Sequence, residues 1–178
     1  MRSVVANVVL WACVIVVGLE IGAGIFEART WVPLWASAPP ESIIAFVQTK
    51  AVNPTLFTDA GGRFWIYSTP LVGIIALLTL ATSFWTSGEH KRWRLFGSSL
   101  IVGIVILTFV WFAPTIIKLT TEAGLHQFKS REEIESTTSW WITLNWLRVV
   151  WYIGGLMALL KAFKTDPNGI AGSSENPT

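Results

Sequence analysis

Charged residues are scarce in this chain of 178 residues, at 13% of the total, whereas a soluble domain carries about 25%. Apolar residues make up 52%, with 11 Trp and 10 Phe, so the composition indicates a lipid environment. The single cysteine, Cys13, excludes an internal disulfide framework and any zinc or iron–sulfur site built from cysteines. The net charge of +2 is small and dispersed, which argues against a nucleic-acid surface.

Familiar catalytic motifs are also missing. The sequence contains no glycine-rich phosphate loop, nucleophile elbow or paired-histidine zinc helix. His90 lies in a basic loop and is expected on the surface. His126 lies close to Glu122, Glu132 and Glu133, residue types that can bind a metal, but the spacing matches no ligand pattern. We therefore assign no metal site and identify no cofactor from the sequence.

Four stretches are long and apolar enough to cross a bilayer as helices, which takes about 20 residues for a core of roughly 30 Å. They are residues 4–26, 64–86, 96–117 and 140–160. A closed barrel needs strands of alternating polar and apolar residues, which these runs lack. The sequence predicts an all-α polytopic membrane protein, with a four-helix transmembrane domain over residues 1–164 and a disordered cytoplasmic tail over 165–178.

The connection between the second and third spans sets the expected orientation. It is only about ten residues long and carries Lys91, Arg92 and Arg94, and such short positive loops stay in the cytoplasm. Both termini are then cytoplasmic, and the two longer connections face outward. The expected location is the bacterial inner (cytoplasmic) membrane, with the lipid bilayer as a partner and no nucleic acid.

The first outward connection is expected to contain a short helix. Pro39, Pro40 and Glu41 are typical of a helix start, and apolar residues then recur near helical spacing as far as Val52. A short amphipathic helix on the outer membrane surface satisfies this pattern. It either packs over the mouth of the bundle or forms a lid over a ligand pocket.

The two charges inside the spans are the most informative residues, because an unpaired charge in lipid is strongly unfavourable. Glu20 and Arg148 lie at similar depths, about 10 and 12 Å below the outer boundary at a rise of 1.5 Å per residue. We therefore predict an ion pair between them. Such a pair either fixes only the register of the helices, anchors a polar group of a substrate, or relays a proton.

Other polar residues share the faces of these charges. In the fourth span Trp141, Asn145, Arg148 and Tyr152 follow one another at steps of four, three and four, so they form one continuous seam. Its middle is polar and its ends are aromatic.

The third span adds Thr108, Pro114 and Thr115, and a proline frees carbonyls that need new donors. Together with the seam, these residues predict a polar pocket in the outer half of the bundle. The cytoplasmic halves of the spans, such as residues 5–16 and 156–160, offer almost no polar group to hold a substrate. Trp residues near the span ends, such as Trp65 and Trp140, are expected to form an interfacial belt.

Three short motifs follow one another in a characteristic order. They are Gly18 to Gly24 with Trp31-Val32-Pro33, then Thr108 to Leu119 with Pro114-Thr115, then Asn145-Trp146-Leu147-Arg148. This order resembles the anthrone-oxygenase-like family of small four-helix membrane proteins. Ile116 and Ile117 stand where that family often has two polar amides. The resemblance implies oxygenation of a polyketide anthrone to the anthraquinone without an obvious bound cofactor.

These observations leave three functions open. The first is a membrane oxygenase, either cofactor-independent or metal-assisted, that acts on a hydrophobic phenol- or quinone-like molecule. In it Arg148 and Asn145 would stabilise an oxyanion and Glu20 would accept a proton. The substrate would contact Thr108, Pro114, Thr115, Trp141 and Tyr152.

The second possible function is a non-catalytic binding or transport protein with the same pocket. The third is a small subunit that packs within a larger membrane complex.

Overall fold

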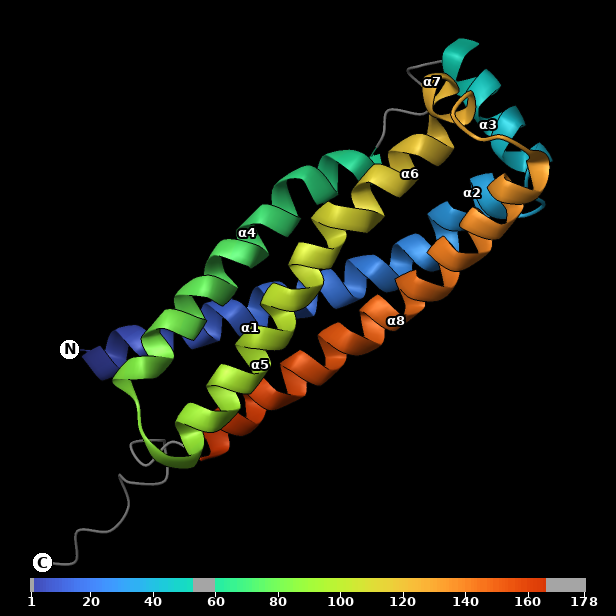
Figure 1. Ribbon diagram of the computed structural model, residues 1–178. Coiled ribbons are helices and arrows are strands. Elements are labelled where there is room, and N and C mark those ends of the chain that lie inside the picture. The colour runs from blue at the N-terminus through green and yellow to red at the C-terminus, as the bar shows by residue number, and fades with distance from the viewer. Residues whose placement is uncertain (1, 53–59, 166–178) are drawn as a thin grey trace, which may run out of the picture.

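A computed structural model gives the structure of the protein and describes residues 2–52 and 60–165. The regular structure of these residues is entirely helical (Figure 1), which confirms the predicted all-α class. The tail expected over residues 165–178 lies, apart from Thr165, outside the described residues. The helices are α1 (Arg2–Phe26), η1 (Glu27–Trp31), α2 (Val32–Ala36), α3 (Glu41–Val52), α4 (Ala60–Thr82), η2 (Ser83–Trp85), α5 (Gly88–Leu107), η3 (Thr108–Phe112), α6 (Ala113–Thr120), α7 (Glu122–Leu125) and α8 (Arg131–Lys164).

Four continuous helical stretches are long and apolar enough to cross a membrane, as predicted. They are Arg2–Ala36, Phe64–Trp85, Gly88–Thr120 and Arg131–Lys164. Three of them have 33 to 35 residues, or about 50 Å at the helical rise, which exceeds the thickness of a bilayer core. Their ends therefore extend past the apolar runs from which the spans were predicted. The chain is an integral membrane protein.

The four long helices form a ring in which each contacts two neighbours. Helix α1 packs against α4 and α8, and α5 packs against the same two helices from the other side. The N-terminus, the α4–α5 connection and the end of α8 lie together at what we call the terminal end (Figure 1). The opposite end, called the cap end, carries α2, α3, α7 and the start of α8. Helices α1 and α8 therefore run antiparallel.

Helix α3 confirms the predicted helix in the first long connection and lies at the cap end. It begins at Glu41, directly after the two prolines, and packs against α2 and α6. The Ser42 hydroxyl donates to the Trp35 carbonyl at 2.9 Å, and Glu41 forms an ion pair with Arg131 at the start of α8. The buried face of α3 consists of Ile43, Phe46 and Val47.

Two of the long helices contain a π-helical turn shortly before a proline. The turn η1 precedes Pro33, and the turn η3 precedes Pro114. A proline inside a helix lacks the N–H donor and its ring clashes with the carbonyl four residues earlier. The wider π turn accommodates that ring, and single π turns are frequent at functional sites.

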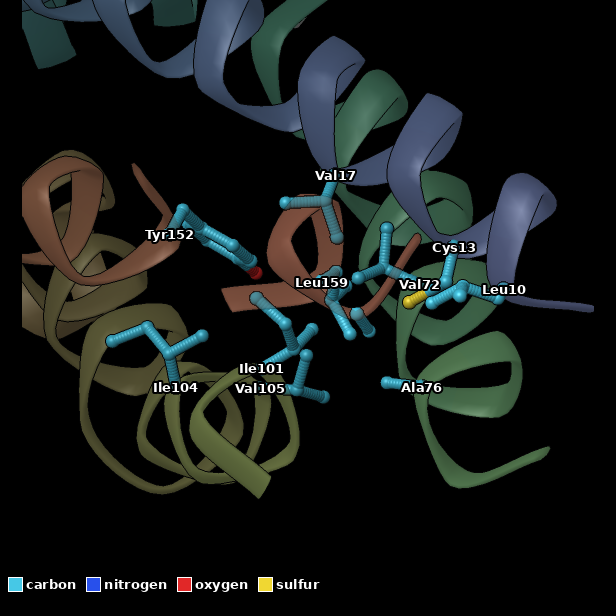
Figure 2. Close-up of a cluster of buried hydrophobic side chains, with 11 residues drawn as sticks. Leu10, Cys13, Val17, Val72, Ala76, Ile101, Ile104, Val105, Tyr152 and Leu159 are labelled. Atoms are coloured by element: carbon cyan, nitrogen blue, oxygen red, sulfur yellow. The ribbon is translucent and has the colours of Figure 1, made fainter. Parts of the chain in front are cut away.

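The apolar core of the terminal half joins all four long helices (Figure 2). Helices α5 and α8 approach each other closely at two glycines: a Cβ atom at Gly97 would lie 2.8 Å from Leu159 Cδ2 and 3.0 Å from the Gly155 carbonyl oxygen. Small residues allow such close contact between helices in membranes. The buried residues of this core are Leu10, Cys13, Val17, Val72, Ala76, Ile101, Ile104, Val105, Tyr152, Leu159 and Ala162.

The terminal half also contains buried polar groups, from residues that were expected in the loop between the second and third spans. Arg94 is fully buried and donates to the Ala6 carbonyl at 2.8 Å and to the Thr82 hydroxyl at 3.0 Å. His90, expected on the surface, is only 3% exposed, and its Nδ1 lies 2.6 Å from the Ala162 carbonyl oxygen. The reason is that α5 begins at Gly88, before the apolar run, so the expected loop is helical and one face points into the bundle.

Candidate functional site

A cavity of about 240 Å³ lies in the cap-end half of the bundle. Its walls come from η1 and α2, from α3, from α4, from η3 and α6, and from α8. Seven of the described lining residues are aromatic, namely Trp31, Trp35, Phe46, Trp65, Phe109, Phe112 and Trp141. A concave, mostly apolar pocket with a few convergent polar groups is the usual form of a small-molecule site.

The polar centre of the cavity is an ion pair between α8 and η1. Arg148 Nη2 lies 3.3 Å from Glu27 Oε2, and the two side chains are only 6% and 14% exposed. Trp65 Nε1 donates to Glu27 Oε1 at 3.0 Å. The guanidinium also lies over the rings of Trp65 and Phe112, at 4.7 and 5.0 Å from their centres. Two charges are thus held in fixed positions against the aromatic wall.

The predicted pair between Glu20 and Arg148 is therefore wrong, because the partner of Arg148 is Glu27. Side chains on a helix tilt toward its N-terminus. Since α1 and α8 are antiparallel, Arg148 reaches toward the cap end and Glu20 reaches away from it. Arg148 therefore pairs with Glu27, which lies two turns beyond Glu20 and is the first residue of the π turn.

Glu20 lies deeper in the bundle and does not line the cavity. It is 2% exposed, and among the described residues neither of its carboxylate oxygens has a hydrogen-bond partner. Its carboxylate lies within electrostatic range of Arg148. The structure therefore brings Glu20 close to the pair without making it part of that pair.

The structure places two of the expected substrate contacts on the cavity wall. Thr108 and Trp141 both line it; the Thr108 hydroxyl donates to the Ile104 carbonyl at 2.8 Å, and Trp141 Nε1 donates to the Phe112 carbonyl at 3.3 Å. Pro114 and Thr115 do not line it, although their neighbours in α6 do.

The remaining residues of the fourth-span seam are buried beside the cavity. Asn145 is 1% exposed and Tyr152 is 3% exposed, and neither lines the cavity. The Asn145 Oδ1 atom has no hydrogen-bond partner within the described residues. Tyr152 belongs to the apolar core of the terminal half (Figure 2). The seam is thus a continuous buried face, but only Trp141 and Arg148 reach the cavity.

Several cavity residues were missed by the sequence reasoning. Trp65, expected in an interfacial belt, points inward to Glu27, whereas Trp140 is 63% exposed. Glu27 was predicted on the same face of the first span as Glu20, seven residues earlier, but not as the partner of Arg148. The sequence predicted the amphipathic helix that carries Phe46 and Lys50. It did not show which residues of this helix face the bundle.

The cavity also reaches the outer surface of the bundle. Three of its lining residues are largely exposed apolar side chains, namely Ile66 at 67%, Phe109 at 53% and Ile117 at 60%. They belong to α4, η3 and α6, within helical stretches that are long and apolar enough to cross a membrane. The cavity therefore opens beside exposed apolar side chains.

The histidine and acidic residues of the second long connection do not form a site. His126 is exposed, as are Glu122 and Glu132. Among residues 2–52 and 60–165, no group of three or more His, Cys, Asp and Glu side chains is placed to hold a metal ion.

Fold and cavity together define a polytopic helical membrane protein with a cavity, lined in part by aromatic residues, between its long helices. The profile of the anthrone oxygenase family matches residues 63–158, which is more than half of the chain. The chain belongs to this family. Comparison with curated proteins and with solved structures found no match. The matched region holds Trp65, Thr108, Trp141 and Arg148, whereas α1, η1 and α3 precede it.

Proposed function

We propose that the protein binds a planar, hydrophobic phenol- or quinone-like molecule in the aromatic cavity and catalyses its oxygenation. The observation that carries this proposal is the buried Arg148–Glu27 pair set into an aromatic wall. Flat rings stack well on such walls, and the two charges offer one donor group and one acceptor group to a polar substituent. Membership of the anthrone oxygenase family supports the reaction class.

The dimensions of the cavity favour a small ring system as the ligand. Its volume of about 240 Å³ is just below the range of about 300–1,000 Å³ that is common for ligand pockets. A molecule of two or three fused rings suits this space better than a lipid chain does. The opening beside Ile66, Phe109 and Ile117 would admit such a molecule directly from the bilayer.

The proposed reaction converts the methylene group of an anthrone into a carbonyl with molecular oxygen. Two C–H bonds break and one C=O bond forms; one oxygen atom enters the product and the other leaves as water. Loss of the first methylene proton to a carboxylate places negative charge on the ring-ketone oxygen. A guanidinium at that oxygen stabilises the charge, more strongly where water is excluded.

Within this proposal, Arg148 stabilises the oxyanion and Glu27 accepts the proton. Glu27 is favoured over Glu20 for this role because Glu27 lines the cavity and Glu20 does not. Glu20 and Asn145 are proposed to act from behind the cavity by positioning Arg148. Thr108 and Trp141 are proposed to contact the rings.

A cavity-filling variant tests the binding step. Ala113 lines the cavity, so Ala113→Phe is expected to weaken binding of 1,8-dihydroxyanthraquinone at least about tenfold, since a ring would occupy the ligand's space. Ala81→Phe, at an exposed position of α4, is the matched control and should bind normally. Binding is measured in nanodiscs by quenching of Trp fluorescence, with empty nanodiscs as the blank. Equal affinity in both variants would place the ligand elsewhere.

The same preparation separates catalysis from simple binding or transport. With 1,8-dihydroxyanthrone and air, the wild-type protein should form anthraquinone faster than empty nanodiscs do, and Glu27→Gln should lose that acceleration while it retains binding. A protein that binds both ring systems without accelerating the reaction would be a non-catalytic binding or transport protein. If neither ring system binds, the small subunit of a larger complex becomes the better account.

We also propose that the terminal end faces the cytoplasm, because the first turns of α5, directly after the α4–α5 connection, concentrate positive charge. Ser87→Cys in that connection should not react with a membrane-impermeant maleimide added to intact cells, whereas Ala123→Cys in α7 should react. Both positions are exposed, and the native Cys13 is buried and serves as the unreactive background. Labelling of position 87 from outside would reverse the assigned orientation.

A further inference from the structure

Lys50 places a third charge on the cavity, separate from the ion pair. It lies in the last turn of α3 and lines the cavity together with Phe46, one turn earlier. Its side chain is partly buried. Within the described residues, no carboxylate lies within 4.0 Å of its ammonium group. Among the lining residues that the structure describes, two are cations and one is a carboxylate.

Lys50 differs from Arg148 in that no carboxylate of the described residues balances its charge. The charge of Arg148 is already balanced by Glu27 at 3.3 Å. Lys50 lines the cavity from the cap end, on a helix that an ion pair between Glu41 and Arg131 joins to the start of α8. Helix α3 is further fixed by its buried face. The excess positive charge is therefore held in place at the cap end of the cavity.

We infer that the ligand of this cavity carries an acidic group, a carboxylate or an ionised phenol, which pairs with Lys50 while the rings lie against the aromatic wall. This inference rests on the proposed function and names the substrate class for that site. An ion pair in a partly desolvated cavity is stronger than one in water. The side opening admits the hydrophobic rings, and the acidic group remains at the cap end, where the cavity is closest to the aqueous phase.

The test compares two probes of nearly equal shape, anthraquinone-2-carboxylate and the uncharged anthraquinone-2-carboxamide. Binding is measured in nanodiscs of phosphatidylcholine, so that the lipid itself carries no net charge. Lys50→Met should weaken binding of the carboxylate about tenfold or more and leave binding of the carboxamide within about twofold, because only the former loses an ion pair. Lys50→Arg should retain the preference for the carboxylate.

Lys129→Met is the matched control, since Lys129 is an exposed lysine at the cap end that does not line the cavity. It should change neither affinity. An equal loss for both probes in Lys50→Met, or no loss for the carboxylate, would overturn the assignment of Lys50 while leaving the cavity as a ligand site. If the wild-type protein binds neither probe, the proposed function itself fails and the inference fails with it.

Discussion

Arg148→Met is expected to lower the free energy of unfolding by about 3–5 kcal/mol, because it removes the cation that faces a buried carboxylate. The side chains of Arg148 and Glu27 are only 6% and 14% exposed, so water cannot replace the lost partner well. The variant also loses the contacts of the guanidinium with the Trp65 and Phe112 rings. Unfolding is measured by denaturant titration in mixed micelles.

A double-mutant cycle separates the pair from the general loss of side-chain contacts. Glu27→Leu combined with Arg148→Met should recover part of the stability, since an apolar pair of similar size leaves no buried charge. Arg29→Met is the charge-matched control at an exposed position; it loses only the contact of Arg29 with the Trp146 ring and should stay within about 1 kcal/mol of the wild type. If the effects of the two single variants simply add, Arg148 and Glu27 are not energetic partners.

The part of the fold that the sequence predicted is the part that depends on local composition. An apolar run of 20 residues must form a helix in lipid, because its backbone groups have no other partners, and all four such runs are helical. The helix at Glu41–Val52 followed from two prolines and an amphipathic repeat, which are also local signals. The extension of three helices past their apolar runs was missed, because polar helical turns outside the lipid carry no hydropathy signal.

The site was harder to predict, because it depends on which faces of distant helices meet. Glu20 and Glu27 share one face of α1, and only the tilt of side chains on antiparallel helices decides which of them meets Arg148. Trp65 and Trp140 look alike in the sequence, yet one lines the cavity and the other is exposed. Composition alone does not separate an aromatic residue that stacks on a ligand from one that lies in the interfacial belt.

At the terminal end, composition likewise does not show which charged residues are buried and which are exposed. Arg92 and Arg94 are two residues apart in the same basic segment, and both supported the predicted orientation. Because the segment is helical, the two side chains point in different directions: Arg92 is exposed, and Arg94 is fully buried. This pair of neighbours therefore allows a comparison in which the charge removed is the same and only the burial differs.

Arg94 connects three helices at the terminal end. From α5 it donates to the Ala6 carbonyl and the Asn7 side-chain oxygen of α1, at 2.8 and 3.4 Å, and to the Thr82 hydroxyl of α4 at 3.0 Å. Hydrogen bonds from a charged donor contribute about 1.5–3 kcal/mol each, and bonds that share one group do not add fully. The planar guanidinium reaches several acceptors at once, which a lysine ammonium cannot do with the same geometry.

Arg94→Met is accordingly expected to destabilise the protein by about 3–5 kcal/mol, and Arg94→Lys should recover only part of this loss. Arg92→Met removes the same positive charge from the same segment and should change stability by no more than about 0.5 kcal/mol. Unfolding in mixed micelles gives the stabilities, and quenching by 1,8-dihydroxyanthraquinone reports on the cavity, which Arg94 does not line. The folded fraction of Arg94→Met should therefore bind the ring system with unchanged affinity. Equal destabilisation by Arg92→Met and Arg94→Met would mean that the charge of the segment matters, and not the hydrogen bonds that join α5 to α1 and α4.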